Sequence, residues 1–384
     1  MINEKMTKKI VCIIGIEFDF TREPRILQEI YALRGQYHLI GVGKSPHPDV
    51  DEFIDITKNK KLLDVFLDKI LRYIKYYFPF LLRFRYRRVL KHIDKIKPDC
   101  ISVHHIESAI LAYGKSNKMI FNSHEFIPKQ NDGNLLWKLS KGWMINRNLP
   151  KVFKHTFIMY VEGDAVKEAY LNYFRNVPKM VVIPNATKAW PDLIPVPVMQ
   201  KDIKIVHHGL ASIGRGLETF IDVASILGSG YSLHLYLMKS DIFPEYYNRL
   251  KKYSSRFSNV YFYDVVPYDN IVPTINRFDI GLCLFKSGNY HTQFTTVPNK
   301  FWEYISARVV PLVSKESAMS RICESNQFGI VSEKPEVQEI VKTILDLNAA
   351  DIFKQKKRLN DLHDQFIAEK CIYPIILNCV KQVL

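Results

Sequence analysis

Short apolar runs alternate with longer helical patterns along most of this chain, and this alternation limits the possible folds more than any other feature. A helix is expected between the first two runs, because Pro24 can open it and Gly35 can end it. Strands that alternate with helices form βαβ units around a parallel sheet. The sequence therefore predicts a doubly wound α/β domain in the first half, with strands at 10–16, 37–43, 100–105, 119–123, 156–161 and 180–185.

The pattern stops once, where Pro191, Pro195 and Pro197 oppose both helix and central strand. It then restarts, with strand candidates at 203–209, 232–238, 260–266, 279–285, 309–314 and 329–331. The carboxyl ends of two such sheets should surround one cleft, where sheets of this kind bind ligands. We therefore predict an N-terminal Rossmann-like domain at 1–188, a linker at 189–201, a second Rossmann-like domain at 202–364, and a C-terminal helix at 365–384 that crosses back to the first domain.

The composition is that of a folded globular protein, since 47% of the 384 residues are hydrophobic and 24% are charged. This excludes a disordered, collagen-like or disulfide-scaffold chain. The six cysteines form no C-x-x-C pair and no zinc-spaced cluster, so we expect reduced thiols and a cytoplasmic protein. The first apolar run is too short for a signal peptide and no run reaches the length of a membrane span, so neither is predicted.

Positive charge is concentrated in one segment. Residues 58–97 contain 13 Lys or Arg and three Asp, which gives +10 of the net charge of +15. A helical face of this composition suits anionic lipid headgroups, so we predict membrane-surface binding. The alternatives are a helix packed on its own domain with a solvated basic side, and a nucleic-acid site, which no RNP-like, zinc-finger or G-x-x-G pattern supports. The cations expected at the membrane are interleaved with bulky apolar residues and are Arg72, Lys75, Arg83, Arg85, Arg87 and Arg88.

Two segments of the second domain carry the pattern of a nucleotide site. The run VPNKFWEYISA, at 297–307, places Glu303 near the start of a helix, where a carboxylate can accept hydrogen bonds from both ribose hydroxyls. In the run HHGLASIGRGLE, at 207–218, three glycines let the backbone approach a ligand, and Arg215 can clamp a diphosphate. Taken alone, Glu303 can equally be a surface carboxylate that caps a helix start.

Together these segments resemble the C-terminal domain of the family 4 type of GT-B glycosyltransferases, and the resemblance extends over nearly the whole chain. It implies a fold of two Rossmann-like domains facing a central cleft. The motif ending in Arg215 and Gly216 would contact the nucleotide diphosphate, and Glu303 would bind the ribose. The remaining donor-binding residues expected from the resemblance are Gly209, Val266, Thr295, Thr296, Asn299 and Lys300.

The N-terminal domain carries further points of resemblance. Glu23-Pro24-Arg25-Ile26 is similar to the start of the family's first helix, and the run NSHE at 122–125 is similar to its "D, any residue, HE" element. An imidazole beside a carboxylate at a strand end can orient or protonate a phosphate or a hydroxyl, so His124 and Glu125 are the predicted catalytic residues. The alternative for His124 is a structural side chain bonded to a backbone carbonyl, and we interpret the preceding pair, His104 and His105, as structural.

Two positions depart from the family pattern. Thr295 stands eight residues before Glu303, where the family has a second glutamate that touches the donor sugar. Leu210 stands where an arginine usually follows the first glycine, so the diphosphate would depend on Arg215, backbone amides and Lys300. No D-x-D pair follows a strand, so no metal ion or other cofactor is expected, and helix dipoles and cations would stabilise the leaving diphosphate.

The resemblance implies a retaining, metal-independent glycosyltransferase that takes a nucleoside-diphosphate sugar as co-substrate. The basic segment suggests a lipid-linked or oligosaccharide acceptor on the N-terminal domain, and surface polysaccharide synthesis (lipopolysaccharide or capsule) at the inner face of a bacterial plasma membrane, without a nucleic-acid partner. A non-catalytic GT-B partner of a polysaccharide assembly complex is the main alternative, because of Thr295 and Leu210. A nucleic-acid-binding protein and a sugar-nucleotide epimerase on the same fold are the others.

Overall fold

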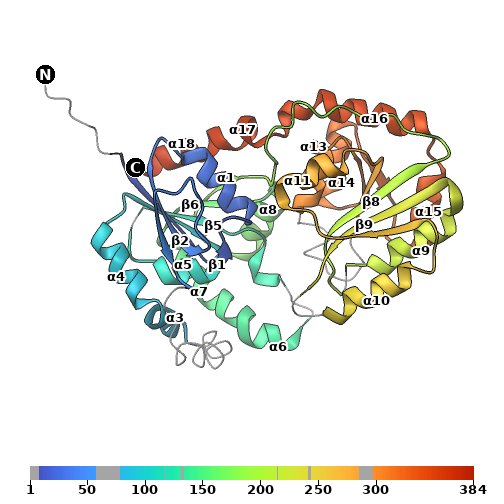
Figure 1. The fold of residues 1–384 in the computed structure, drawn as a ribbon. Helices are drawn as coiled ribbons and strands as arrows, with labels where there is room; N and C mark the ends of the chain where they lie inside the picture. Colours follow the sequence, from blue (N-terminus) through green and yellow to red (C-terminus); the bar gives the residue numbers. More distant parts are fainter. Residues whose placement is uncertain are drawn as a thin grey trace, which may run out of the picture. The chain divides into compact units, whose positions relative to one another are not determined.

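The chain folds into two compact units, each built around one parallel sheet. The computed structural model describes residues 8–57, 78–116, 118–130, 134–213, 215–240, 244–284 and 297–384. Unit 1 consists of Met1–Pro184 and Ile372–Leu384, and unit 2 consists of Asn185–Cys371. Helices cover both faces of each sheet (Figure 1). The predicted doubly wound α/β architecture is confirmed in both units.

Unit 1 contains a seven-stranded sheet of order β3-β2-β1-β4-β5-β6-β7 in which every neighbouring pair is parallel. The first strand is central and almost fully buried, which explains its continuous apolar run. The strands are β1 (Ile10–Asp19), β2 (His38–Lys44), β3 (Glu52–Asp55), β4 (Cys100–His104), β5 (Met119–Asn122), β6 (Thr156–Val161) and β7 (Lys179–Val182).

The helices of unit 1 cover its sheet through apolar faces. Helix α1 opens at Pro24 as predicted, and it buries Ile26, Ile30 and Leu33 completely. Helix α18, from the end of the chain, packs against α1. The helices are α1 (Pro24–Leu33), α3 (Pro79–Arg85), α4 (Arg87–Ile96), α5 (His105–Ala112), α6 (Leu135–Trp137), α7 (Trp143–Phe153), α8 (Asp164–Tyr173) and α18 (Tyr373–Val383), with a π-helical turn at Lys138–Gly142 between α6 and α7.

Unit 2 contains a six-stranded parallel sheet of order β10-β9-β8-β11-β12-β13. Its strands are β8 (Ile203–Leu210), β9 (Tyr231–Met238), β10 (Val260–Tyr263), β11 (Ile280–Cys283), β12 (Val310–Ser314) and β13 (Ile330–Ser332). Its helices are α9 (Leu217–Leu227), α10 (Pro244–Ser254), α11 (Tyr268–Ile275), α13 (Asn299–Ser306), α14 (Ala318–Asn326), α15 (Val337–Leu345), α16 (Ala349–Asp361) and α17 (Ala368–Cys371).

The boundaries of the two units differ from the predicted ones. Unit 1 ends at Pro184 instead of residue 188, and the chain returns to it at Ile372 instead of residue 365. The segment predicted as a linker, 189–201, belongs to unit 2. Trp190 and Leu193 pack against the core of that unit, and Arg308 Nη2 donates to the carbonyl oxygen of Trp190 at 3.2 Å. The prolines prevent regular secondary structure in this segment, but its apolar side chains still pack against the core of unit 2.

All twelve predicted strands are present, most within one or two residues of the expected ends, and the four-residue strand β3 was missed. Strand β3 pairs only with β2 at the edge of the sheet and its side chains are at most half-buried. Two apolar residues among four do not distinguish such an edge strand from a loop.

The predicted membrane-binding segment is only partly within the described residues. Arg72 and Lys75 lie outside them. Helices α3 and α4 carry the other cations, of which Arg87 and Arg88 are exposed. Arg83 packs on its own unit, because its Nη1 donates to the carbonyl oxygen of Tyr113 at 3.2 Å. None of the helices that the structure describes is long and apolar enough to cross a lipid bilayer.

Candidate functional site

The predicted nucleotide site of unit 2 is assembled where helix α13 meets the sheet. A side chain at Gly281 would lie 2.6 Å from the Tyr304 ring, so this glycine allows α13 to lie closely on strand β11. The same ring packs edge-on against His208, the residue before Gly209 on β8. This close packing brings the side chains at the start of α13 to the carboxyl end of β8.

Two cations converge over Gly209 at the end of β8. A Cβ atom added to this glycine would lie 3.6 Å from Lys300 Nζ and 3.7 Å from Arg215 Nη1. Its φ of +127° is one that side-chain-bearing residues rarely adopt. Among the described residues, neither cation has a carboxylate within ion-pair distance. The combination of a bare backbone and two cations without a counter-ion is suited to an anionic ligand.

His207 positions Lys300 in this site. Its Nδ1 lies 2.9 Å from the carbonyl oxygen of Leu282, which can only accept, so Nδ1 carries the proton. The Nε2 lone pair then accepts a hydrogen bond from Lys300 Nζ at 3.2 Å. Burial lowers the pKa of His207 well below its usual value, which keeps the ring neutral. Burial, together with nearby Arg215, lowers the pKa of Lys300 to about 8.

Glu303 lies in the same site and is only 5% exposed. Its Oε2 is 3.4 Å from Nε2 of His208. Burial raises the pKa of Glu303 to about 7, and the Lys300 charge opposes this rise. Burial and Lys300 also lower the pKa of His208 to about 3, so the imidazole facing the carboxyl group is neutral. Glu303 is therefore a buried carboxyl group whose ionisation falls within the physiological pH range.

The other predicted donor-binding residues are placed as follows. Gly216 precedes α9 with a φ of +68°, and Asn299 is the first residue of α13. Val266 is half-buried against the apolar cluster that contains Phe301. Thr295 and Thr296 lie outside the described residues. The structure thus brings Gly209, Arg215, Lys300 and Glu303 together and adds His207 and His208, which were quoted in the sequence motif but given no role.

The predicted catalytic histidine of unit 1 belongs to a chain of hydrogen-bonded groups. His124 Nε2 lies 3.0 Å from His104 Nδ1, and His104 Nε2 lies 2.8 Å from Glu29 Oε2. On its other side, His124 Nδ1 lies 3.5 Å from Glu23 Oε1. The Phe18 ring stacks on His124 with centroids 4.9 Å apart. His104 is therefore linked directly to the predicted catalytic residue, and its structural interpretation was incomplete.

Glu125 has different partners from His124. Its carboxylate accepts a hydrogen bond from Gln130 Nε2, and its backbone oxygen accepts one from the Tyr170 hydroxyl at 3.1 Å. Burial raises the pKa of its carboxyl group. The two predicted catalytic residues are adjacent in sequence, but no described contact joins their side chains.

A second buried group lies beside this chain. His105 Nδ1 is 2.6 Å from Glu107 Oε2, and Glu17 Oε2 is 3.8 Å from the same nitrogen. These three residues are the one described set of His, Cys, Asp or Glu side chains whose ligand atoms lie within 4.8 Å of one another. Lys141 Nζ lies 3.3 Å from Glu107 Oε1. We interpret the group as an ion-pair network, because two cations balance its two carboxylates.

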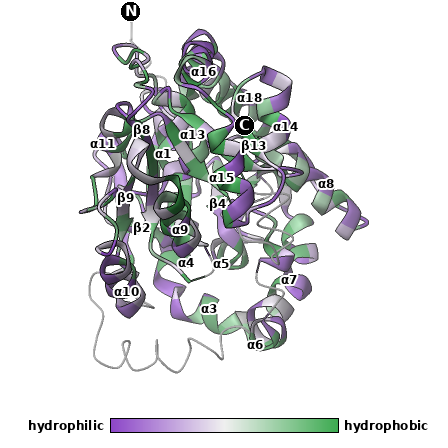
Figure 2. Cartoon of the chain, turned by 90° about the vertical axis from the view of Figure 1, so that its right-hand side faces the viewer, coloured by the Kyte–Doolittle hydropathy of each residue, from purple (hydrophilic) through white to green (hydrophobic). Residues whose placement is uncertain are grey.

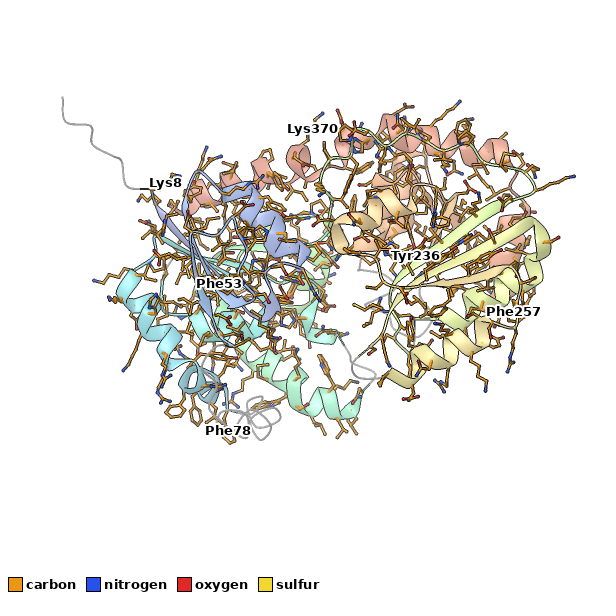
Figure 3. The ribbon with its side chains drawn as sticks, in the orientation of Figure 1. Lys8, Phe53, Phe78, Tyr236, Phe257 and Lys370 are labelled. Carbon is orange, nitrogen blue, oxygen red and sulfur yellow. The ribbon has the colours of Figure 1, made fainter. Side chains whose placement is uncertain are left out.

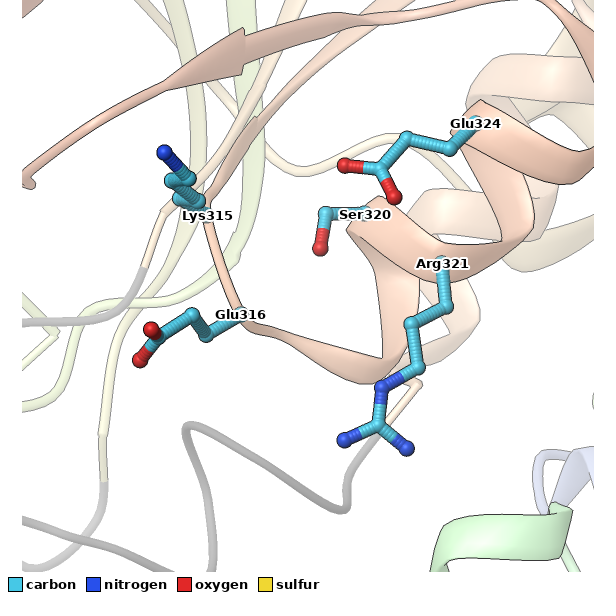
Figure 4. Close-up of a pocket in the computed structure, with 5 residues that line it drawn as sticks. All are labelled: Lys315, Glu316, Ser320, Arg321 and Glu324. Carbon is cyan, nitrogen blue, oxygen red and sulfur yellow. The ribbon is translucent and has the colours of Figure 1, made fainter.

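Unit 2 also contains an open hollow of about 470 Å³ beside the first turns of α14. Figure 4 shows the five polar side chains that line it, which are Lys315, Glu316, Ser320, Arg321 and Glu324. Its charges are of both signs, and Lys315 is already paired with Glu333 at 2.7 Å. It contains none of the predicted site residues.

No family model matches the sequence, and no curated protein matches it. Solved structures do match over nearly the whole chain. An α,α-trehalose-phosphate synthase (UDP-forming) from Burkholderia vietnamiensis has 11% identity and a TM-score of 0.69, with 98% of each chain covered. Anabaena HepE in complex with UDP and glucose has 10% identity and a TM-score of 0.69, with 98% of each chain covered.

A third match is WaaG, a glycosyltransferase involved in lipopolysaccharide biosynthesis, with 12% identity and a TM-score of 0.64, covering 97% of this chain and 99% of WaaG. At these identities the similarity establishes the fold. The chain has the two-domain α/β GT-B fold that the sequence motifs predicted.

Proposed function

We propose that this protein is a glycosyltransferase that transfers a sugar from a nucleoside-diphosphate sugar. The observation that carries the proposal is the convergence of Lys300 and Arg215 over Gly209, with buried Glu303 beside them. Two cations over a bare backbone match a diphosphate, and a carboxylate next to them matches the vicinal hydroxyls of a ribose. UDP-, GDP- and ADP-sugars contain both parts, whereas dTDP-sugars share the diphosphate but lack the 2′-hydroxyl.

The similar structures support this substrate class. HepE is described in complex with UDP and glucose and also with UDP-glucose, and the trehalose-phosphate synthase is described as UDP-forming. WaaG, which acts in lipopolysaccharide biosynthesis, supports a role in bacterial surface polysaccharide synthesis. We therefore place the proposed reaction in the synthesis of a lipopolysaccharide or a capsule.

The proposed reaction is retaining and needs no metal ion. The charges of Lys300 and Arg215 would stabilise the leaving diphosphate, which is the task that a divalent cation performs in other sites. Retention is proposed from the family resemblance of the motifs. Anomeric analysis of the product by NMR tests it directly, and an inverted anomer would contradict it.

We further propose a lipid-linked or oligosaccharide acceptor that is reached from the inner face of the plasma membrane. Phe78, Phe80 and Phe84 on and before α3 are 50%, 64% and 62% exposed, which is unusual for such large apolar side chains. Figure 3 shows Phe78 at the edge of unit 1. Arg87 stacks on Phe84, with its guanidinium 4.6 Å from the ring centroid. Exposed rings beside exposed cations suit the boundary between anionic headgroups and acyl chains.

A second segment strengthens the membrane proposal. Leu135, Leu136 and Leu139, on α6 and the π-helical turn, are 69%, 79% and 58% exposed. Helices α3 and α6 both lie at the lower edge of unit 1 in Figure 1, and both contain residues coloured as hydrophobic in Figure 2. Residues 78–93 and 134–155 contain five Lys or Arg each and no Asp or Glu. Both segments are therefore apolar and cationic without a carboxylate that would be repelled by anionic lipids.

The donor proposal is tested by a thermal-shift and nucleotide-release screen of the protein against UDP-, GDP-, dTDP- and ADP-sugars, with and without EDTA. We expect one donor to raise the melting temperature and to release its nucleoside diphosphate slowly, with EDTA having no effect. A shift without release would favour the non-catalytic partner, an alternative suggested by Leu210. No shift with any donor would overturn the nucleotide-sugar proposal.

The membrane proposal is tested by sedimentation with vesicles that contain anionic phospholipid. Replacing Arg85, Arg87 and Arg88 with Ser should release the protein from these vesicles without changing nucleotide affinity. The matched control replaces the exposed cations Arg249, Lys251 and Lys252 of α10 with Ser, which changes the net charge equally. Equal loss of vesicle binding in both variants would indicate non-specific electrostatic attraction. Unchanged vesicle binding in the first variant would contradict membrane binding by α3 and α4.

A further inference from the structure

A line of four titratable side chains runs from the interior of unit 1 to its surface. The contacts Glu29 to His104, His104 to His124 and His124 to Glu23 measure 2.8, 3.0 and 3.5 Å. Exposure increases along the line, because the side chains of Glu29 and His104 are 1% and 0% exposed whereas those of His124 and Glu23 are 12% and 22% exposed. One end is therefore closed and the other can meet a ligand.

The geometry holds both imidazole rings in place. Both nitrogens of each ring face a partner within the line, so rotation of either ring would break a contact on each side. Phe18 stacks on the face of His124, and the backbone of His124 has a φ of +64°, which costs energy for a residue other than glycine. Glu29 Oε1 is buried without a hydrogen-bond partner among the described residues, so this carboxylate interacts with the line through one oxygen only.

Counting protons shows what the line can do. In one arrangement, His104 carries protons on both nitrogens and is paired with the Glu29 carboxylate, while His124 donates from Nδ1 to an ionised Glu23. In the other, His104 keeps only its Nε2 proton, His124 holds its proton on Nε2, and Glu23 is protonated. The two arrangements contain the same three protons and differ by two transfers, one along the 3.0 Å hydrogen bond between the rings and one across the 3.5 Å contact between His124 and Glu23. We propose that Glu29, His104, His124 and Glu23 form a proton relay whose outer group, Glu23, exchanges a proton with a substrate hydroxyl.

In the proposed transferase, which this inference presupposes, the relay would take up the proton that the acceptor hydroxyl loses as its oxygen bonds to the sugar. Glu23 receives that proton, passes it to Nδ1 of His124, and Nε2 of His124 releases its own proton to Nδ1 of His104. The resulting imidazolium is stabilised by the Glu29 carboxylate, and Glu23 is ionised again. No proton is created or lost, and the positive charge ends in the interior beside a negative one.

The surroundings favour a mobile proton at the outer end. Burial raises the pKa of Glu23 and, with the neighbouring charges, lowers that of His124, so neither group holds a charge easily. The charged or titratable groups that act on the outer pair from the surrounding elements are Arg25 of α1, His104 of β4 and His105 of α5. The adjacent His105 and Glu107 pair has different neighbours, because Lys141 Nζ lies 3.3 Å from Glu107 and the partly exposed Glu17 lies 3.8 Å from His105.

The relay is tested first without any substrate. Long-range 1H–15N spectra of the histidine-labelled protein report which ring nitrogens carry protons, and His104→Gln and His124→Gln assign the signals. We expect Glu29→Gln to shift the ring nitrogens of His124, which Glu29 reaches only through His104, and Glu23→Gln to shift those of His104. Glu107→Gln is the matched control and should shift His105 more than His124, because Glu107 is bonded to His105 and to neither ring of the line. His124 signals that are identical in the wild type and in Glu29→Gln would overturn the relay, and Glu23→Gln provides the same test from the exposed end if Glu29→Gln fails to fold.

The second test uses the donor found in the nucleotide-release screen and a supplied acceptor. Glu23→Gln should lower kcat about 100-fold, the range typical of general acid or base loss, and leave the KM of the donor within twofold. Glu29→Gln should lower kcat less and move the acid limb of the pH profile, whereas Glu107→Gln should do neither. Unchanged kcat in Glu23→Gln would overturn the relay's catalytic role. If the wild type turns over no donor, the proposed function fails, while the spectra still decide whether the four groups are coupled.

Discussion

The two units place their candidate sites at the same position of the same kind of sheet, yet the sites differ in chemistry. In unit 1, His104 ends β4 and His124 follows β5, and these two histidines are bonded to each other and, through His104, to Glu29. In unit 2, two cations converge on Gly209, the second-last residue of β8, and neither has a carboxylate within ion-pair distance among the described residues. The first arrangement pairs most of its polar groups with one another, whereas the second presents positive charge that suits an anion. The parallel sheet determines where a site forms, and the residues after each strand determine what it binds.

The largest effect that this comparison predicts is at Glu303. Glu303→Ala removes the carboxylate expected to hold the ribose, and we expect transfer to fall by about 100-fold or more with a weaker donor affinity. Steady-state nucleotide release and isothermal titration measure the two quantities. The matched control is Glu324→Ala, which removes an exposed carboxylate from α14 of the same unit. Unchanged kinetics in Glu303→Ala would contradict the assignment of the nucleotide site to α13.

A smaller effect is predicted for the glycine under the two cations. Gly209→Ala places a methyl group in contact with Lys300 and Arg215, and we expect the affinity for a nucleoside diphosphate to fall about tenfold. Gly228→Ala is a matched control, because Gly228 also has a positive φ but faces open space. Both variants should lose similar stability in thermal melts, of about 1 kcal/mol. Equal affinity of the two variants for the nucleoside diphosphate would show that Gly209 is not part of the anion site.

The ionisable groups of unit 2 predict a narrow pH range for nucleotide binding. As the pH falls through about 7, Glu303 becomes protonated and can no longer accept two hydrogen bonds. As the pH rises through about 8, Lys300 loses its charge and the diphosphate loses a partner. Affinity should therefore be highest between these values and fall several-fold at pH 6 and pH 9. Titration of Lys300→Arg should extend binding to higher pH, and a flat profile in the wild type would contradict these assignments.

The smallest effect is expected on the affinity for a nucleoside diphosphate when a residue of unit 1 is replaced. His124→Ala removes the middle of the histidine line, but it should leave the affinity for a nucleoside diphosphate within twofold. Direct calorimetric titration of the variant with UDP or the base selected in the screen measures this. A large loss of affinity would show that the two sites are not chemically independent.

Sequence patterns predicted the sheets well because strand periodicity and helix boundaries are local properties. The resemblance to the family motifs, and not periodicity, predicted that Arg215, Lys300 and Glu303 would share one site, and the structure brings them together. The sequence patterns did not predict the buried polar side of α1. Its apolar residues identified one buried face, but Arg25 and Glu29, four residues apart on an adjoining face, are also buried at 3% and 1% exposure. Periodicity cannot show that a polar face will be covered by partners distant in the chain, such as His104.

The same reason explains the two histidines of unit 2 that received no role. His207 and His208 precede Gly209 in the quoted motif, but their partners Lys300 and Glu303 are more than 90 residues away. A pair of histidines at a strand end indicates a polar site. Only the register of the sheet and the docking of α13 show which histidine holds the cation and which faces the carboxyl group.

The return of the chain to unit 1 at Ile372 has a consequence for synthesis on the ribosome. Unit 2 is an insertion between Pro184 and Ile372, so it can fold completely while unit 1 still lacks α18. Helix α18 packs against α1, the helix that carries Glu29, and its Cys379 interacts with Tyr160 of β6. A helix that is translated after the whole of unit 2 thus packs behind the helix that carries Glu29. A nascent chain would complete its candidate nucleotide site before the surroundings of its histidine line, and a chain that stops before α18 would leave the second unfinished.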